Sequence, residues 1–317
     1  MVHTDAAHLP FDGSVHLMTK VASHEADLVA LRAALDSSSA FQALVEKYPE
    51  AATWCTDTNL VRFLHARGYK VEQSLKLIIE ALEWRATRRP DLIDKLPENE
   101  ELLSKESSTG KLYCAGSDRW GRPVVIFNNT VENSNDSEGR MLLLAWNLEF
   151  ACKMMPTGVD KFVAFVHLEK FSLMNTPSLR ETRDTIQMLC RCYPERLGHC
   201  IVYKAPSVFN TLFNAIKGLL DPRTVAKLVF IKGDVSDGSE NDMRMRELLG
   251  PDWKVLTGAE QPVYQPRSSP GYRHDVHWPA TMQKLREMRA RESSGASHCH
   301  STASGASTAP STVAVAE

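Results

Sequence analysis

The stretch "PERLGHCIVYKAP", from Pro194 to Pro206, places a glutamate and an arginine directly before Gly198 and a strand-like apolar run. A short continuous apolar run is typical of a strand that is covered on both faces. The charged pair before the run fits two situations. It lies either at the exposed end of a surface helix, where ion pairs contribute little, or beside a cavity that the strand helps to line.

Four further apolar runs surround this strand in the sequence: "LYC", "VVIFNN", "FVAFVHLE" and "AKLVFI". The first two flank the turn "SDRWGRP" and predict a hairpin. Segments with apolar residues three and four positions apart precede the later runs: "GRMLLLAWNLEFACKMM", "SLRETRDTIQMLCRCY" and "SVFNTLFNAIKGLLDPRT". Strands that alternate with helices predict an α/β fold with a mainly parallel sheet.

The region before the strands has a helical period. Between residues 26 and 89, "ADLVALRAAL", "TDTNLVRFLHAR" and "VEQSLKLIIEALEWRATRR" each predict a helix, and Gly68 is expected to end the second. We therefore expect a flexible segment over 1–25, a helical lobe over 26–104 and an α/β domain over 105–265. A linker and disordered tail are expected over 266–317, with a short helix near "MQKLREMRARE".

The composition excludes several classes of protein. The 317 residues include 37 Lys and Arg against 39 Asp and Glu, so a nucleic-acid binder that relies on a positive field is not expected. No apolar run approaches the ~20 residues of a membrane-spanning helix. The opening "MVHTDAAHLPFDGS" lacks the pattern of a signal peptide, and we therefore expect a cytosolic protein.

Metal and catalytic signatures are absent from the sequence. The seven cysteines form no CxxC pair, which favours free thiols and no metal site. "HCIVYKAP" begins like a phosphatase loop, but Pro206 stands where that loop needs its arginine. Lys105 replaces the first glycine of a P-loop, and neither GxSxG nor GxGxxG occurs. His167 is interpreted as a core histidine, so the chain is not expected to be an enzyme.

Four segments resemble the CRAL-TRIO family, the Sec-fourteen-like lipid-binding and transfer proteins. They are "LVRFLHARGYKVEQSLKLIIEALEWR", "DRWGRPVVIF", "YPERLG" and "LLDPRTVAKLVFI", and they follow the family's order within residues 57–257. The resemblance implies a helical N-terminal lobe, a sheet floor and a helical gate over a pocket for one lipid. This agrees with the α/β architecture expected from the apolar runs.

The phosphatidylinositol-binding branch of the family implies a headgroup site at Arg67, Glu195, Arg196, Thr224 and Lys227. In physical terms, Thr224 and Lys227 share one face of a short helical turn, and "DPRT" predicts an Asp N-cap followed by a proline. A buried lysine needs a partner, so Glu195 is expected to pair with Lys227. The alternative is that this pair is a structural bridge in a pocket for another ligand.

The sequence departs from the family pattern at two places. Gly68 stands where a second basic residue often follows the counterpart of Arg67, which removes one phosphate contact. Phe162 and Ala164 stand where members that exchange phosphatidylcholine place hydroxyl groups. The second exchange ligand therefore stays open, and an apolar guest is one alternative.

An apolar stripe marks the expected gate. Its members fall within an arc of about 120° at helical spacing: Phe209, Leu212, Phe213, Ile216, Leu219 and Leu220. Such a stripe is usually core packing, but a lipid pocket must be sealed in water and opened at a membrane. Pro206 and Gly218 are expected to act as hinges, and Leu219 and Leu220 to touch the bilayer.

The resemblance implies a non-enzymatic protein that binds and transfers phosphatidylinositol. No cofactor is expected, and the bound molecule is the phospholipid. Membrane lipids, contacted transiently at membrane surfaces, are the expected partners, with lipid kinases as further candidates. A monomer that binds no nucleic acid is expected. Two alternatives stay open: a carrier of a neutral hydrophobe such as a sterol or terpenoid, and an enzyme or regulatory scaffold with the same fold.

Overall fold

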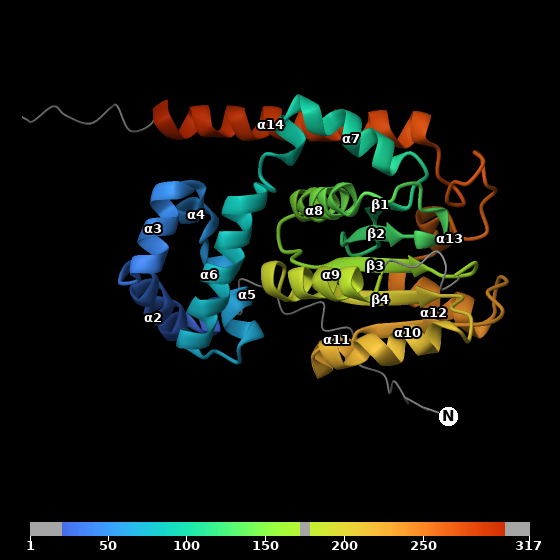
Figure 1. The fold of residues 1–317 in the computed structure, drawn as a ribbon, viewed down its shortest axis with the longest axis horizontal. Coiled ribbons are helices and arrows are strands. Elements are labelled where there is room, and N and C mark those ends of the chain that lie inside the picture. The colour runs from blue at the N-terminus through green and yellow to red at the C-terminus, as the bar shows by residue number, and fades with distance from the viewer. Residues whose placement is uncertain (1–20, 172–177, 302–317) are drawn as a thin grey trace, which may run out of the picture. The chain divides into compact units, whose positions relative to one another are not determined.

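The computed structural model describes residues 21–171 and 178–301, and it divides into two compact units (Figure 1). One unit reaches to His274 and the other begins at Asp275. The first unit holds a helical part followed by a sheet with helices on both faces, which confirms the predicted α/β fold class. Among the described residues, no helix is both long and apolar enough to cross a bilayer.

The helical part has a continuous apolar core. Its elements are α2 (Glu25–Asp36), α3 (Ser39–Lys47), α4 (Glu50–Trp54), α5 (Asp57–Ala66) and α6 (Val71–Arg88). Leu60, Phe63 and Leu64 of α5 are completely buried in this core. Thr56 caps α5 by accepting a hydrogen bond from the Asn59 N–H, and Gly68 ends the following turn with φ of +59°.

Five strands of the described chain form one sheet in the order β1-β2-β3-β4-β5. They are β1 (Leu112–Ser117), β2 (Pro123–Phe127), β3 (Phe162–His167), β4 (Leu197–Tyr203) and β5 (Leu228–Ile231). The first pair is an antiparallel hairpin and all later pairs are parallel, as the sequence predicts. In the hairpin turn, the Asp118 carboxylate accepts hydrogen bonds from the N–H groups of Trp120 and Arg122.

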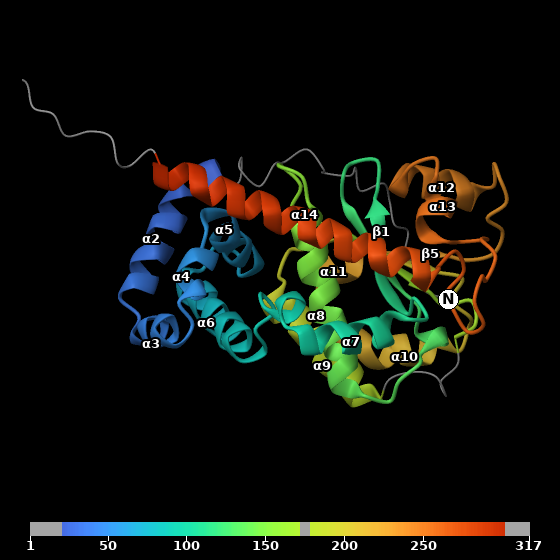
Figure 2. The same ribbon diagram turned by 90° about the horizontal axis from the view of Figure 1, so that it is seen from above.

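Helices and short 3-10 turns connect the strands. The connecting elements are η1 (Ile93–Lys95), α7 (Pro97–Ser107), η2 (Asn129–Val131), α8 (Ser137–Met154), α9 (Leu179–Cys192), α10 (Phe209–Ile216), η4 (Lys217–Leu219) and α11 (Pro222–Ala226). After β5 come α12 (Glu240–Leu249) and α13 (Trp253–Thr257). Figure 2 shows α12 and α13 on one side of the sheet and α8 to α10 on the other.

The two faces of the sheet are filled differently. The face toward α12 and α13, called the packed face, consists of Val124, Ile126, Val163, Phe165, Ile201, Tyr203, Val229 and Ile231, all of which are buried. The opposite face, called the open face, consists of Val125, Phe127, Ala164, Val166, Cys200, Val202, Leu228 and Phe230. Five of these eight side chains stay partly exposed: Phe127, Val166, Cys200, Leu228 and Phe230.

The stripe from Phe209 to Leu220 is not one helix. The α-helix α10 ends at Ile216, and the chain continues as a 3-10 turn to Leu219. Leu220 is extended, with φ of −96° and ψ of 138°. Asp221, which directly precedes Pro222, is also extended and caps a new helix that has Pro222 at its first position. Leu219 and Leu220 therefore follow the helix that carries the other four apolar residues.

The last described element is α14 (His274–Ser301). It is longer than the short helix that the sequence predicts inside the 266–317 tail. The segment "MQKLREMRARE" consists mainly of strong helix formers, which accounts for a helix there. Residues 302–317 and 1–20, expected to be disordered and flexible, lie outside the described residues.

Candidate functional site

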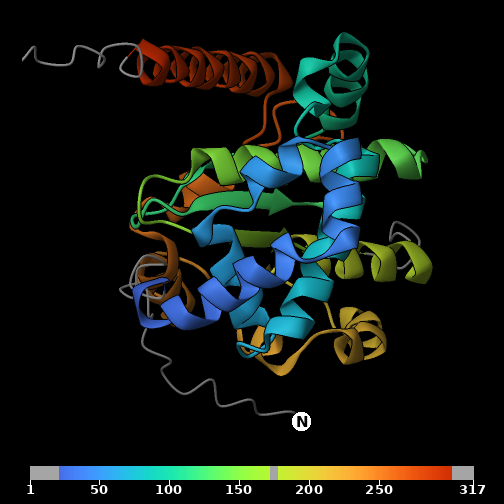
Figure 3. The ribbon, with the colours of Figure 1, turned by 90° about the vertical axis from the view of Figure 1, so that its left-hand side faces the viewer.

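The turn between α9 and β4 carries the PER motif. Glu195 in this turn has a left-handed backbone with φ of +59°, which is uncommon for a residue other than glycine. The buried Arg62 of α5 donates a hydrogen bond from Nη1 to the Pro194 carbonyl at 2.9 Å. Figure 3 shows the helical part, which includes α5, in front of the sheet. The helical part therefore fixes the motif that precedes β4.

The Glu195 carboxylate lies between two basic side chains. His65 Nδ1 is 3.2 Å from Oε1 and Lys227 Nζ is 3.6 Å from Oε2, while the Glu195 side chain is only 15% exposed. Burial alone would raise the pKa of Glu195, but the close approach of His65 and the charge of Lys227 outweigh burial and lower the pKa to about 2. Glu195 is therefore anionic at neutral pH, and the Glu195–Lys227 pair expected from the sequence is present.

Thr224 lies beside Lys227, whose N–H donates to the Thr224 carbonyl at 3.1 Å, whereas Arg67 lies near Cys190 of α9. Asp221 caps α11 by accepting from the Thr224 N–H at 2.9 Å and from the Thr224 hydroxyl at 2.6 Å, so that hydroxyl is already engaged. Arg67 follows α5, and its Nη1 donates to the Ala66 carbonyl. Burial and the charge of Asp221 raise the pKa of the Cys190 thiol while Arg67 lowers it, so both charges lie near that thiol of α9.

Arg196 points elsewhere. Its Nη1 donates to the Asp160 carbonyl at 3.0 Å and lies 3.6 Å from the Met155 sulfur. It is thus engaged with the loop before β3 instead of the Glu195–Lys227 pair. The sequence groups Arg196 with Glu195 because they are adjacent, but Glu195 lies in a turn with a left-handed backbone, and the Arg196 side chain is directed to the loop before β3.

A buried network supports the motif from behind. Arg85 of α6 makes two hydrogen bonds to Glu149 of α8, at 2.9 and 3.2 Å, and the Tyr193 hydroxyl donates to Glu149 at 2.8 Å. Burial would raise the pKa of Glu149, but Arg85 outweighs it and the pKa is lowered. Tyr193 directly precedes Pro194, so the network anchors the PER turn to α6 and α8.

Sequence reasoning missed His65 and Arg62. Both belong to "LVRFLHARG", and their spacing of three residues places them on neighbouring positions of one helix face. From the sequence, a headgroup-binding role was assigned only to Arg67, at the end of this helix. The sequence did contain a signal for these two residues: Arg62 lies among the core residues of the helix, one turn before His65.

The predicted gate helix packs directly on the open face. Phe209, Leu212 and Phe213 of α10 contact an apolar cluster with Val166, Val202, Cys200, Leu168, Phe171, Ala205 and Phe230. The Phe213 and Phe230 rings meet edge to face at 5.6 Å, and Phe171 meets Phe209 at 5.5 Å. Ile216 on the same helix is partly exposed, as are Leu219 and Leu220 beyond it.

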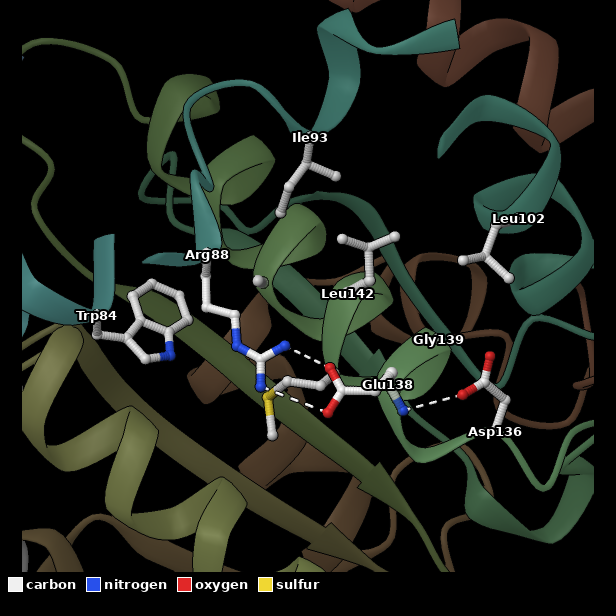
Figure 4. Close-up of a pocket in the computed structure, with 10 residues that line it drawn as sticks. Trp84, Arg88, Ile93, Leu102, Asp136, Glu138, Gly139 and Leu142 are labelled. Atoms are coloured by element: carbon white, nitrogen blue, oxygen red, sulfur yellow. Dashed lines mark hydrogen bonds and ion pairs between the residues drawn. The ribbon is translucent and has the colours of Figure 1, made fainter. Parts of the chain in front are cut away.

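A separate pocket of about 150 Å³ lies where α6, η1, α7 and α8 meet (Figure 4). Apolar side chains that include Trp84, Ile93 and Leu142 line it, and an ion pair between Arg88 and Glu138 crosses its rim. None of the residues of the predicted headgroup site lines this pocket. Within the described residues, no group of three or more His, Cys, Asp or Glu side chains is arranged to hold a metal ion.

A family model described as the CRAL/TRIO domain matches residues 107–246. These residues form a CRAL/TRIO domain. They contain the whole sheet, the PER turn and α10, while Arg62, His65 and Arg67 lie before the matched region. The chain therefore contains a domain of a lipid-binding family, preceded by helices that complete the polar cluster.

The curated relatives of this chain are distant. Two CRAL-TRIO domain-containing proteins of Schizosaccharomyces pombe, C23B6.04c and C3H8.02, are 29% and 28% identical over 56% and 63% of this chain. The phosphatidylinositol transfer protein PDR17 of Saccharomyces cerevisiae is 24% identical over 75% of this chain. The matches span 17%, 47% and 65% of these relatives, so the chain covers less than two thirds of each.

Proposed function

We propose that this protein binds phosphatidylinositol and transfers it between membranes. The observation that carries the proposal is the Glu195 carboxylate, held at positive φ between His65 and Lys227 at the amino edge of the open face. A strained, charged turn beside a partly exposed apolar surface suits a lipid, whose polar head and apolar chains need both environments. The name of PDR17 supports the same ligand.

In this proposal, Glu195 accepts hydrogen bonds from inositol hydroxyls while Lys227 and Arg67 contact the phosphate. Charge-assisted hydrogen bonds of this kind are worth ~1.5–3 kcal/mol each. Thr224 joins the phosphate contacts once its hydroxyl turns away from Asp221. Arg196 acts as a positioning residue, because it ties the PER turn to the loop before β3.

The acyl chains occupy the open face beneath α10. Cys200 supports this location, since it is partly exposed and yet burial raises the pKa of its thiol to about 12. That combination is expected of a thiol that borders an enclosed apolar space. Burying acyl methylenes there contributes about 0.8 kcal/mol per group.

The gate consists of α10 and the 3-10 turn after it. Phe209, Leu212, Phe213 and Ile216 cover the acyl chains, and Leu219 and Leu220 touch the bilayer during transient docking. The protein works in the cytosol as a monomer, carries lipid without chemical change and meets lipid kinases at membrane surfaces. A cysteine crosslink between α10 and β5 should block exchange and retain bound lipid; exchange at the uncrosslinked rate would show that α10 is not the gate.

Lys227→Ala tests the headgroup assignment. We expect it to abolish phosphatidylinositol transfer between vesicles while the protein still folds, although with a lower melting temperature, because Glu195 loses the charge of Lys227 but keeps its contact with His65. Lys76→Ala is the matched control, since Lys76 is an exposed lysine of α6. Normal transfer by folded Lys227→Ala protein would contradict the assignment.

Mass spectrometry of lipid that copurifies with the protein tests the ligand itself. Phosphatidylinositol is the expected species. Recovery of a sterol or terpenoid alone would identify a carrier of neutral hydrophobes, in which the Glu195–Lys227 pair is a structural bridge.

A further inference from the structure

Two lysines stand at equivalent places on either side of the PER turn. Lys161 directly precedes β3, and the next residue, Phe162, donates its N–H to the Arg196 carbonyl at 2.8 Å. Lys227 directly precedes β5, and its carbonyl accepts from the Cys200 N–H at 2.9 Å. Because β3 and β5 are the two parallel neighbours of β4, the lysines flank the start of β4 from both sides.

The two ammonium groups act on the same side chains. Both Lys227 and Lys161 lower the pKa of Glu195. Burial lowers the pKa of His199, which follows Gly198 in β4, to about 4, with Arg122, Lys227 and Lys161 contributing in the same direction. A Cβ on Gly198 would lie 3.5 Å from Lys161 Cβ, and Lys227 Nζ is 3.6 Å from Glu195 Oε2, so both lysines lie beside the start of β4 at the amino edge of the sheet.

The charges in this space do not balance. Lys227 pairs with Glu195, and Arg122 of the same edge pairs with Asp118 at 2.6 Å. Lys161 is partly buried, and within the described chain it has neither an ion pair nor a side-chain hydrogen bond. Desolvating an ammonium group without a counter-ion is unfavourable, so an anionic ligand group is the natural partner.

Gly68, which follows Arg67 after α5, adds no side chain to this space. The family often has a basic residue at the position of Gly68, but here the chain is left-handed, with φ of +59°, and a side chain on Gly68 would meet nothing within 4 Å.

We propose that Lys161 joins Lys227 in a two-lysine clamp for a phosphate monoester on the inositol ring. The clamp selects lipids that carry such a monoester over unphosphorylated phosphatidylinositol, whose phosphodiester Lys161 does not contact. This inference rests on the proposed function. A phosphodiester carries one negative charge, whereas a monoester adds about −1.5 to −2 at neutral pH. The unpaired Lys161 supplies the additional positive charge that the monoester requires.

The test measures lipid extraction from phosphatidylcholine vesicles that carry either phosphatidylinositol or a phosphatidylinositol monophosphate. Vesicles matched in charge with phosphatidylserine control for general attraction to anionic surfaces. The wild-type protein should favour the monophosphate about tenfold, the factor expected of one charge-assisted contact. Lys161→Ala should lose that preference while extracting phosphatidylinositol within about twofold of wild type. Lys161→Arg should retain most of the preference, and Lys76→Ala all of it.

Three results would overturn the clamp. The first is a Lys161→Ala variant that still prefers the monophosphate, and the second is a Lys161→Ala variant that extracts both lipids equally less than wild type. The third is wild-type extraction that depends only on the charge of the vesicle. Wild-type extraction of phosphatidylinositol without the monophosphate also refutes the clamp, but it leaves the proposed function standing. If the wild-type protein extracts neither inositol lipid, the proposed function itself fails.

Discussion

The packed face and the open face belong to the same sheet but differ in how completely their side chains are buried. On β4, Ile201 of the packed face is completely buried, whereas the adjacent Cys200 of the open face is partly exposed. On β5, Ile231 and Phe230 differ in the same way. Since neighbouring residues share one backbone, the difference comes from what covers each face: α12 and α13 fill one side, and α10 covers the other incompletely.

This contrast separates stability from ligand binding. The tightly packed side chains of the packed face stabilise the domain, and removing one of them leaves a cavity. Apolar surface that is covered but not filled contributes less to folding and remains available to a guest. The following predictions are ordered by the size of the effect expected, and each tests whether the two faces differ as described.

Trp253→Ala should have the largest effect. Trp253 is completely buried against the packed face, and its indole N–H donates to Asp242 at 2.8 Å. We expect a loss of about 3–5 kcal/mol in the free energy of unfolding, measured by denaturant titration. Phe230→Ala on the open face is the control and should cost less than half as much. Equal losses would mean that the faces contribute alike.

Glu195→Gln tests the polar edge where the open face begins. The pKa of Glu195 is about 2 in the folded protein, below the ordinary value of 4.5. The ionised carboxylate therefore stabilises the folded state fully above about pH 5, and this stabilisation disappears as the pH falls toward 2. We expect the variant to be less stable by on the order of 2–3 kcal/mol at pH 7, with the gap closing in acid. A gap that stays constant from neutral to acid pH would contradict this.

Ile201→Phe and Cys200→Phe form a matched pair on one strand. Ile201→Phe overfills the packed face and should destabilise the protein by about 1–3 kcal/mol. Cys200→Phe places the same ring on the open face, where we expect a smaller loss of stability together with reduced lipid extraction. If Cys200→Phe proves the more destabilising of the two, the open face is as tightly filled as the packed face.

The smallest effect concerns the reactivity of the Cys200 thiol. With a pKa of about 12, this thiol is almost entirely protonated at neutral pH and should react slowly with an apolar maleimide. Bound lipid should slow the reaction further by covering the open face. Mass spectrometry of the modified peptide measures the rate, and Cys200→Ser identifies the signal. A rate that is indifferent to lipid would place the acyl chains elsewhere.

Sequence patterns predicted the sheet well because its apolar runs are continuous and separated by clear helical periods. The same reasoning failed after Ile216, where the apolar stripe continues at helical spacing although the backbone does not. Periodicity shows which side chains are apolar, but it does not show that Leu220 and Asp221 are extended or that Asp221 and Pro222 start a new helix.

The polar site was only partly predictable. Glu195 and Lys227 meet as expected. Glu195 lies in the turn before β4, and Lys227 directly precedes β5, the parallel neighbour of β4. The engagement of Thr224 with Asp221 and the turn of Arg196 toward Asp160 depend on local hydrogen bonds that residue type alone does not specify. Lys161 was missed because it belongs to no motif and becomes notable only through the alignment of β3 with β4.

The hydrogen bond from Arg62 to the Pro194 carbonyl also has a consequence for the order of folding. The two residues are 132 positions apart in the sequence. Closing so long a loop is entropically unfavourable, and such contacts form only after the segments at either end are structured. During synthesis the segment that forms the helix of Arg62 leaves the ribosome long before Pro194. The position of the PER turn is therefore fixed late, when a segment made early meets a turn made much later.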